Sequence, residues 1–253
     1  MKALVSQAVV AERFGPPQQV LNLTKLVHPE PLPHQVIVRM TAVALNPSDL
    51  IPVRGAYPHR TPLPFIPGFE GVGVITSLGE HCPGWTLGQR VMPVGTAGAW
   101  QTLRVVNASQ CIPVPSDVPD STAARSYINP ITAHHMVQRY AGGAATVALN
   151  ASSSSIAVIL AHLLHQQGIQ VVELGSRSTG TADSLFLDTA GDDWMRNVRD
   201  LGQQQVIDLA FDCVGGTEGE WLAQAVRVGE RWCTMACCRV DLCRSVCSSI
   251  ARI

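Results

Sequence analysis

The stretch Thr146–Arg177, TVALNASSSSIAVILAHLLHQQGIQVVELGSR, contains the pattern that decides the fold. Thr146–Leu149 is short and apolar, which predicts a buried strand. The small polar turn Asn150–Ser155 follows, and the apolar residues after it recur at helical spacing until Gly168, which ends the predicted helix. Val171–Leu174 predicts a second buried strand. Strand, turn, helix and strand form a βαβ unit, and the N-terminus of its helix is suited to binding an anion.

The turn of this unit lacks the glycines that usually bring a backbone close to a phosphate. Ser155 and Ala157 stand where glycines are expected. Hydroxyl and backbone N–H groups of the turn can still hold a pyrophosphate, and the candidates are Ser153, Ser154, Ser155 and Ile156. Because many βαβ units bind no ligand, the turn by itself is weak evidence.

Ser176 and Arg177 directly follow the second predicted strand. An arginine at this place can pair with the 2′-phosphate of NADP, whereas NAD favours a carboxylate that binds the ribose hydroxyls. The alternative is that Arg177 is a solvated loop residue. The turn and the arginine alone do not decide between these readings.

The overall composition excludes several classes of protein. The chain has 253 residues and a net charge of -1, so it offers no electrostatic field for nucleic acid. Its hydrophobic fraction of 46% is sufficient for a core, and no apolar run reaches membrane-spanning length. The first residues resemble neither a signal peptide nor a transit peptide. We therefore expect a cytoplasmic protein without a membrane partner.

Proline divides the chain into two parts. All but one of the seventeen prolines precede Asp120, and the exception is Pro130. Proline is disfavoured in helices and central strands, so the first part is expected to be loop-rich and mostly β. Several short strands separated by Gly/Pro turns predict a small barrel there. The predicted strands are Ala3–Val10, Gln35–Val43, Val72–Leu78, Arg90–Val94 and Trp100–Val106.

Six short motifs occur in an order that is typical of a known family. They are Asn46–Asp49 (NPSD), Gly55–Pro58 (GAYP), Pro67–Gly73 (PGFEGVG), Gly88–Val91 (GQRV), Asn129–Ala133 (NPITA) and Asp212–Gly216 (DCVGG). Together they resemble the medium-chain dehydrogenase/reductase superfamily from Met1 to about Trp232. The similarity is greatest to its zinc-independent branch, which contains 2-enoyl thioester reductases and quinone oxidoreductases.

This resemblance implies an α/β protein with two domains. Residues 1–120 would form a GroES-like β-barrel domain with the catalytic residues. Residues 121–232 would form an incomplete NADP-binding Rossmann domain, a doubly wound parallel sheet. Relatives are often dimers through the edge of that sheet, so a homodimer is possible.

The residues argue against a catalytic zinc. Zinc-binding relatives carry a histidine where this chain has Phe69, and a cysteine at or near Asn46. Phenylalanine cannot bind zinc and asparagine is a poor zinc ligand. Cys82 and Cys111 are isolated in the sequence, and we interpret them as small buried hydrophobic residues.

Reduction of a conjugated C=C bond needs no metal. NADPH supplies a hydride to the β-carbon, and a donor then protonates the α-carbon. The resemblance to enoyl thioester reductases implies that Tyr57 is this donor, because it matches the tyrosine that those enzymes use. A phenol with a pKa near ~10 is protonated at neutral pH. On local sequence alone, Tyr57 would be interpreted as closing a proline-rich turn, and only the surrounding motifs favour the catalytic role.

The resemblance also assigns roles to two asparagines. Asn46 would anchor the loop beside the nicotinamide, although it could simply form an Asn-Pro turn. Asn129 would help seat the nicotinamide, although a helix-capping role is about as probable from the sequence. Glu70 belongs to a family motif and is expected to be structural.

The resemblance stops after Trp232. Five of the eight cysteines lie between Cys233 and Cys247, and residues 233–253 lack strand or helix patterning. With suitable codons for the residues from Cys233 onward, moving the reading frame by one base would give the sequence Val-His-Tyr-Gly, which resembles the family. We therefore interpret the tail as a frameshift product and the chain as truncated. A metal-binding tail is the alternative, although no paired C-x-x-C occurs.

Three functions therefore remain open. The first is NADPH-dependent reduction of 2-enoyl thioesters, and the second is NADPH:quinone oxidoreduction. The third is an inactive remnant that at most binds nucleotide. If the tail is out of frame, an uncovered sheet edge would lower stability, promote aggregation or require a partner.

Overall fold

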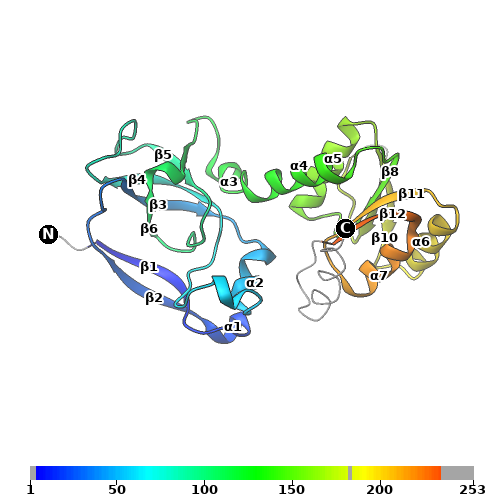
Figure 1. Cartoon of the computed structure of the whole chain (residues 1–253), viewed down its shortest axis with the longest axis horizontal. Helices are drawn as coiled ribbons and strands as arrows, with labels where there is room; N and C mark the ends of the chain where they lie inside the picture. The colour runs from blue at the N-terminus through cyan, green and yellow to red at the C-terminus, as the bar shows by residue number, and fades with distance from the viewer. Residues whose placement is uncertain (1–3, 182–183, 235–253) are drawn as a thin grey trace. The chain divides into compact units, whose positions relative to one another are not determined.

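The computed structural model describes residues 4–181 and 184–234 of the chain (Figure 1). It divides into two compact units, Met1–Ile128 and Asn129–Ile253. Among the described residues, no helix combines the length and apolar character that crossing a membrane would need.

Unit 1 consists of two antiparallel sheets and short helical turns. The hairpin β1–β2 pairs Leu4 with His28 at its open end and Ala11 with Leu21 at the turn. The second sheet has the strand order β6-β3-β4-β5-β7. The strands are β1 (Leu4–Ala11), β2 (Leu21–His28), β3 (Gln35–Val43), β4 (Gly71–Leu78), β5 (Arg90–Pro93), β6 (Leu103–Asn107) and β7 (Cys111–Pro113). The short α-helices are α1 (Pro17–Val20), α2 (Leu50–Val53) and α3 (Asp120–Ala123).

The core of the five-stranded sheet explains two of the cysteines. Cys82 and Cys111 are both buried in one cluster with Val36, Val38 and Ile75. Burial raises the pKa of the Cys111 thiol to about 11. The prediction that these two cysteines are small buried hydrophobic residues is confirmed.

The hairpin and the five-stranded sheet are joined by a segment that we predicted to be part of a strand. The strand predicted for Trp100–Val106 begins only at Leu103. Trp100 and Thr102 instead bond to β1, with Val9 N donating to Trp100 O at 2.9 Å and Thr102 N donating to Gln7 O at 2.8 Å. The backbone leaves one sheet for the other here, which alternation of side chains does not reveal.

Unit 2 is a five-stranded, wholly parallel sheet with helices on both faces (Figure 1). The strand order is β10-β9-β8-β11-β12. The strands are β8 (Thr146–Leu149), β9 (Gln170–Gly175), β10 (Leu185–Asp188), β11 (Ile207–Asp212) and β12 (Val226–Thr234). The helices are α4 (Ile128–Tyr140), α5 (Ser155–Gln166), α6 (Trp194–Gln203) and α7 (Gly216–Ala225).

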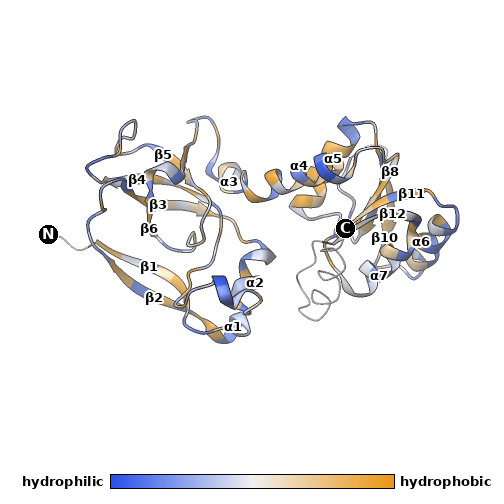
Figure 2. Ribbon diagram, viewed as in Figure 1, coloured by the Kyte–Doolittle hydropathy of each residue, from blue (hydrophilic) through white to orange (hydrophobic). Residues whose placement is uncertain are grey.

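Two apolar clusters show how the sheet is covered. Helices α4 and α5 pack with Val147 and Leu149 on one face, and α6 and α7 pack with Ala148 on the other. Alternate residues of β8 therefore point to opposite faces, both of which are buried. In Figure 2, β8 is hydrophobic and α6 is largely hydrophilic, as expected for a buried strand and a surface helix. The predicted doubly wound sheet is confirmed.

The βαβ unit at the centre follows its sequence pattern closely. Helix α5 begins after Ser154, whose side chain accepts the N–H of Ala157 at 3.3 Å. It ends where Gly168 adopts a φ of 74°, a left-handed conformation that favours glycine. Strand β9 then pairs in parallel with β8. The predicted strands, helix and stop signal in this stretch are all present.

Strand β12 continues past the point where the family resemblance ends. It runs to Thr234 and pairs with β11 through Cys233, which is partly buried against the cluster under α5. The rest of the predicted tail, residues 235–253, lies outside the described residues. The frameshift and metal-binding hypotheses for the tail, and the expected instability, stay predictions.

Replacing Leu160 by alanine should lower the free energy of unfolding of unit 2 by about 2–5 kcal/mol, because this fully buried α5 side chain would leave a cavity. Val158 lies on the same helix with 38% of its surface exposed, so Val158→Ala should change the value by about 0.5 kcal/mol or less. Urea denaturation followed by circular dichroism measures both. Equal losses in the two variants would contradict the assigned burial.

Candidate functional site

The carboxyl edge of the parallel sheet is held by a buried amide–carboxylate pair. Asn150 follows β8 and Asp212 ends β11, and both side chains are almost wholly buried. Asn150 Nδ2 donates to Asp212 Oδ1 at 2.7 Å, and Asn150 Oδ1 accepts the N–H of Cys213 at 2.6 Å. Because β9 and β11 lie on opposite sides of β8, this pair marks the place where the chain reverses its direction of winding.

The turn after β11 wraps tightly around the same carboxylate. Asp212 Oδ1 also accepts the N–H groups of Val214 at 3.0 Å and Gly215 at 2.8 Å. Gly215 and Gly216 have φ values of 70° and 58°, which glycine adopts without strain. A Cβ on Gly219 would lie 2.5 Å from Asp212 Oδ2, so only glycine fits there. The glycines of this motif thus allow a tight turn at the carboxyl end of β11.

Ser152 joins the two predicted cofactor segments, and sequence reasoning missed it. Its N–H donates to Leu174 O at 3.1 Å, and its hydroxyl donates to Arg177 O. A Cβ on Gly175 would lie 2.4 Å from the Ser152 hydroxyl, so the glycine permits this close approach. The signal in the sequence was Gly175 at the end of a β-strand, where glycine often marks such an approach.

The turn residues predicted to hold a pyrophosphate occupy different positions. Ser153 and Ser155 are exposed at the N-terminal end of α5, where unpaired N–H groups and the helix dipole favour an anion. Ser154 is the N-cap and its hydroxyl accepts the Ala157 N–H. Ile156 packs against the apolar cluster beneath α5, so only its backbone is suited to ligand binding.

Ser176 and Arg177 are exposed just after β9. The acidic residue nearest to them in sequence, Glu173, is buried within the strand. It accepts hydrogen bonds from Ser178 Oγ at 2.8 Å and from Thr179 N at 2.7 Å. Burial raises the pKa of Glu173, but the bonds from Thr179 and Ser178 outweigh that effect and hold the pKa below its usual range. The Glu173 carboxylate is therefore engaged in hydrogen bonds within the protein, whereas the exposed Arg177 carries a positive charge.

Unit 1 contains a separate cavity of about 790 Å³ that is lined by Tyr57. Proline, aliphatic and aromatic side chains form most of its wall, with Phe65 and Phe69 among them. The loop Gly95–Gly98 forms another part of the wall. Arg60 is the one charged residue among the described residues that line the cavity. Such a site resembles a ligand pocket with a few placed polar groups in an apolar wall.

Tyr57 precedes a short 3₁₀ turn, Pro58–Arg60, and its side chain is partly buried. The guanidinium carbon of Arg60 lies 4.2 Å from the centroid of the Tyr57 ring, which is a cation–π contact. Gly55, with a φ of 85°, allows the preceding chain to turn against Phe14. Tyr57 therefore lies at a turn, as predicted, and lines a cavity. Its role as proton donor stays a prediction.

A buried arginine supports the loop that faces this cavity. Arg104 has 2% of its surface exposed, and its guanidinium donates to Thr96 O at 2.7 Å, Thr96 Oγ1 at 3.0 Å and Ala97 O at 3.2 Å. Burial lowers its pKa to about 10, so it stays charged at neutral pH. Sequence reasoning missed Arg104, because a lone arginine in a strand is ordinarily exposed.

Asn46 does not line the Tyr57 cavity but belongs to an adjoining buried network. Its Nδ2 donates to Glu70 Oε1 at 2.8 Å, while Glu70 Oε2 accepts the N–H groups of Tyr127 at 3.3 Å and Ile128 at 2.8 Å. Asp49 accepts the Asn46 N–H at 2.7 Å. Glu70 is wholly buried and binds the last residues of unit 1, which agrees with its expected structural role.

Asn129 lies in the first turn of α4 and is partly buried. It is the first residue of unit 2, whereas Asn46 and Tyr57 belong to unit 1. Its predicted contact with nicotinamide stays a prediction. Among the described residues, no group of three or more His, Cys, Asp or Glu side chains is placed to hold a metal ion.

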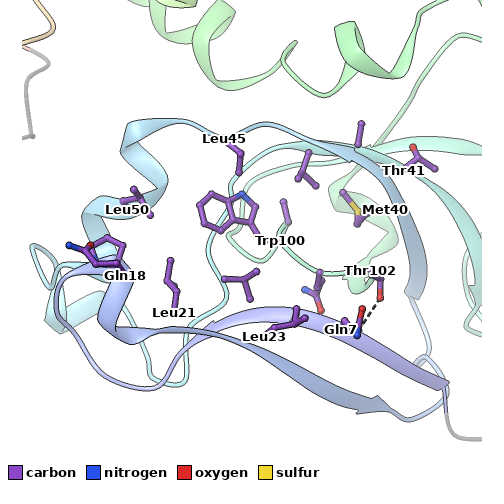
Figure 3. A pocket seen from close by; sticks show the side chains of 17 residues that line it. Gln7, Gln18, Leu21, Leu23, Met40, Thr41, Leu45, Leu50, Trp100 and Thr102 are labelled. Atoms are coloured by element: carbon purple, nitrogen blue, oxygen red, sulfur yellow. Dashed lines mark hydrogen bonds between the residues drawn. The ribbon is translucent and has the colours of Figure 1, made fainter.

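A second cavity of about 790 Å³ in unit 1 is less suited to chemistry (Figure 3). Leu21, Leu23, Leu45 and Leu50 line it around the ring of Trp100. None of the described residues that line it is acidic, basic, tyrosine or cysteine. Its wall therefore offers packing surface but no acid, base or nucleophile.

Comparisons with known proteins agree with this architecture. Residues 32–116 match the family model of the alcohol dehydrogenase GroES-like domain. The chain is 30% identical over 239 residues to the mitochondrial enoyl-[acyl-carrier-protein] reductase of Arabidopsis thaliana, and 31% identical over 237 residues to the protein of that name from Xenopus tropicalis. These alignments cover 88% and 85% of this chain.

The chain spans just under two thirds of the length of these two relatives, 63% and 65%. A solved structure of a candidate NADPH:quinone reductase from Bacillus thuringiensis is 30% identical and superimposes with a TM-score of 0.80. That match covers 92% of this chain and 73% of the other. The order of the motifs, the two folds and these similarities lead to one conclusion: the chain belongs to the medium-chain dehydrogenase/reductase superfamily.

Proposed function

We propose that this protein is an NADPH-dependent reductase of the C=C bond of 2-enoyl thioesters that works without zinc. The observation that carries the proposal is the placement of Tyr57 in an apolar cavity whose described lining contains no carboxylate, histidine or cysteine. The phenol is the most acidic of the described hydroxyl groups in this wall, and Arg60 keeps its proton, so Tyr57 is the best-suited donor. The similarity to two enoyl-[acyl-carrier-protein] reductases supports this substrate class.

The carboxyl edge of unit 2 fits NADPH. The N-terminus of α5 and the hydroxyls of Ser153 and Ser155 are exposed where a pyrophosphate would bind. Arg177 and Ser176 would hold the 2′-phosphate. Glu173, the acidic residue of β9, is buried and bonded internally, so its carboxylate is not available to the ribose hydroxyls of NAD.

The fit has one unfavourable feature. Ala151 has a φ of 52°, a conformation that an alanine adopts only with strain, in the turn where the family usually has glycines. The chain tolerates this because Ser152 is anchored on both sides, by Leu174 and by Arg177. The turn is thus fixed by one backbone bond and one side-chain bond of Ser152 instead of by glycine.

NADPH supplies the hydride that reduces the β-carbon of the substrate. The protein contributes the remaining steps. The apolar cavity excludes water from the acyl chain, and the Tyr57 hydroxyl protonates the α-carbon as negative charge develops on the thioester oxygen. Arg60, which stacks on the Tyr57 ring, keeps the phenol in one orientation. Asn46 acts indirectly, by holding Glu70, and Asn129 would contact the nicotinamide.

Quinone reduction is the second candidate, because the 30% identical solved structure is of a candidate NADPH:quinone reductase. That reaction needs electron delivery but no dedicated donor for a carbon atom. An inactive protein that binds nucleotide is the third possibility, and lack of activity towards both substrates in folded protein would favour it.

Replacing Tyr57 by phenylalanine should reduce kcat/KM for crotonyl thioester by about 10²–10⁴-fold, because the variant lacks the proton donor but keeps the ring. Quinone turnover should be unchanged. NADPH oxidation at 340 nm measures both activities. Tyr140→Phe is the matched control, since Tyr140 packs against the apolar cluster of unit 2. Full thioester activity in Tyr57→Phe would exclude the proposed donor.

Replacing Arg177 by glutamine should weaken NADPH binding by about 10-fold and leave NADH binding unchanged, because only NADPH carries the 2′-phosphate. Fluorescence titration with each nucleotide measures this without turnover. Arg196→Gln removes a similarly exposed arginine that pairs with Asp193, and should leave both affinities unchanged. An equal loss for NADH and NADPH would contradict the assigned role of Arg177.

A further inference from the structure

We propose that the Tyr57 cavity binds free medium-chain carboxylates, such as 2-enoates, with the carboxylate held by Arg60 beside the Tyr57 ring. The inference rests on the proposed function in so far as it takes this cavity to be the acyl site. It adds a ligand class that is no thioester, and it makes Arg60 the residue that selects for negative charge.

The charge of the cavity wall is the first argument. Arg60 is the single charged side chain among the described lining residues, and Ser48, Tyr57, Thr61, Thr96 and Gln101 supply the remaining polar side chains. No described acidic residue lines the cavity. A bound group next to Arg60 is therefore favoured if it is anionic, since no carboxylate of the wall opposes it.

The position of the Arg60 guanidinium is the second argument. Its carbon lies 4.2 Å from the centre of the Tyr57 ring, so the cation and the phenol are held side by side. Arg60 is exposed and forms no ion pair with a described carboxylate. Its planar set of N–H donors is thus available to a carboxylate oxygen.

A second cation reinforces the field inside the cavity. Arg104 lies one layer behind the wall, where its Nε is 3.8 Å from the position that a Cβ on Gly98 would take. Its described partners are backbone carbonyls and the Thr96 hydroxyl, none of which carries a compensating negative charge. In a poorly solvated wall, an uncompensated cation favours negative charge in the adjoining space.

The apolar residues of the cavity wall determine which kind of chain the ligand carries behind its charged group. Ile51, Phe65, Ile66 and Phe69 form an apolar surface in a cavity of about 790 Å³, which suits a hydrocarbon chain. An apolar chain that ends in a carboxylate matches both the wall and its two cations. Such acids would occupy the same space as the acyl group of a thioester, so they should compete with it.

Calorimetric titration of the full chain with trans-2-hexenoate and trans-2-hexenamide tests this. These ligands differ in charge but hardly in shape. Hexenoate should bind at least fivefold more weakly to Arg60→Gln than to the wild type, while hexenamide affinity should change less than twofold. Arg60→Lys should give an intermediate value for hexenoate, because it keeps the charge but loses the planar donors.

Arg54→Gln is the matched control. Arg54 is an exposed arginine six positions earlier that does not line the cavity, so its removal changes the net charge equally. Hexenoate should bind Arg54→Gln as it binds the wild type. The inference is overturned if hexenoate binding is absent, is unaffected by Arg60→Gln, or falls equally in Arg54→Gln.

This test is independent of catalysis. Hexenoate binding that depends on Arg60, in a protein that reduces no thioester, would support the carboxylate site and refute the proposed reductase function. Thioester reduction that depends on Tyr57, with no preference for hexenoate over hexenamide, would support the function and refute the carboxylate site.

Discussion

The hydrogen bond from Asn150 to Asp212 is the contact on which the carboxyl edge of unit 2 depends. It joins the ends of two parallel strands that are 62 positions apart, and both groups are buried. A buried carboxylate is stable only when its oxygens are bonded, and Asn150 together with the turn after β11 supplies those bonds. The ends of β8 and β11 are thereby fixed where the winding reverses, which is where α/β sheets bind their ligands. The exposed N-terminus of α5 and the Ser152–Arg177 bond are built around this fixed edge.

Unit 1 also contains buried charged side chains. They hold loops in place through hydrogen bonds to uncharged groups and do not form ion pairs with described residues. Glu70 is bonded by one amide side chain and two backbone N–H groups, and Arg104 is bonded by backbone carbonyls and a hydroxyl. Removing either group would leave several backbone groups without partners, at about 1–3 kcal/mol each. Such residues fix loops firmly because each holds several backbone atoms at once. The loop Gly95–Gly98, which lines the same cavity as Tyr57, is held by Arg104 in this way.

The sequence predicted the architecture well because its patterns are local. Strand β8, helix α5 and strand β9 follow directly from apolar periodicity, a serine cap and Gly168. It predicted the site less well. Strand β2 and the junction at Trp100 depend on pairing with distant segments, and Ser152 and Arg104 act through bonds to residues that are remote in sequence. Local patterns do not encode such partners. Tyr57, Asn46 and Asn129 were reached only through a resemblance, whereas the NADP residues came from the βαβ pattern. All of these roles stay predictions.

The order of strands in unit 2 also has a consequence for how the chain folds. The central strand β8 is synthesised about 60 residues before β11, its partner on one side. Until β11 emerges, one edge of β8 and the amide of Asn150 have no native partner. Closing so long a segment costs entropy before any strand pairing repays it. We therefore expect the β8–α5–β9 segment to form first from local contacts, and the sheet to be completed later, once Asp212 has been made.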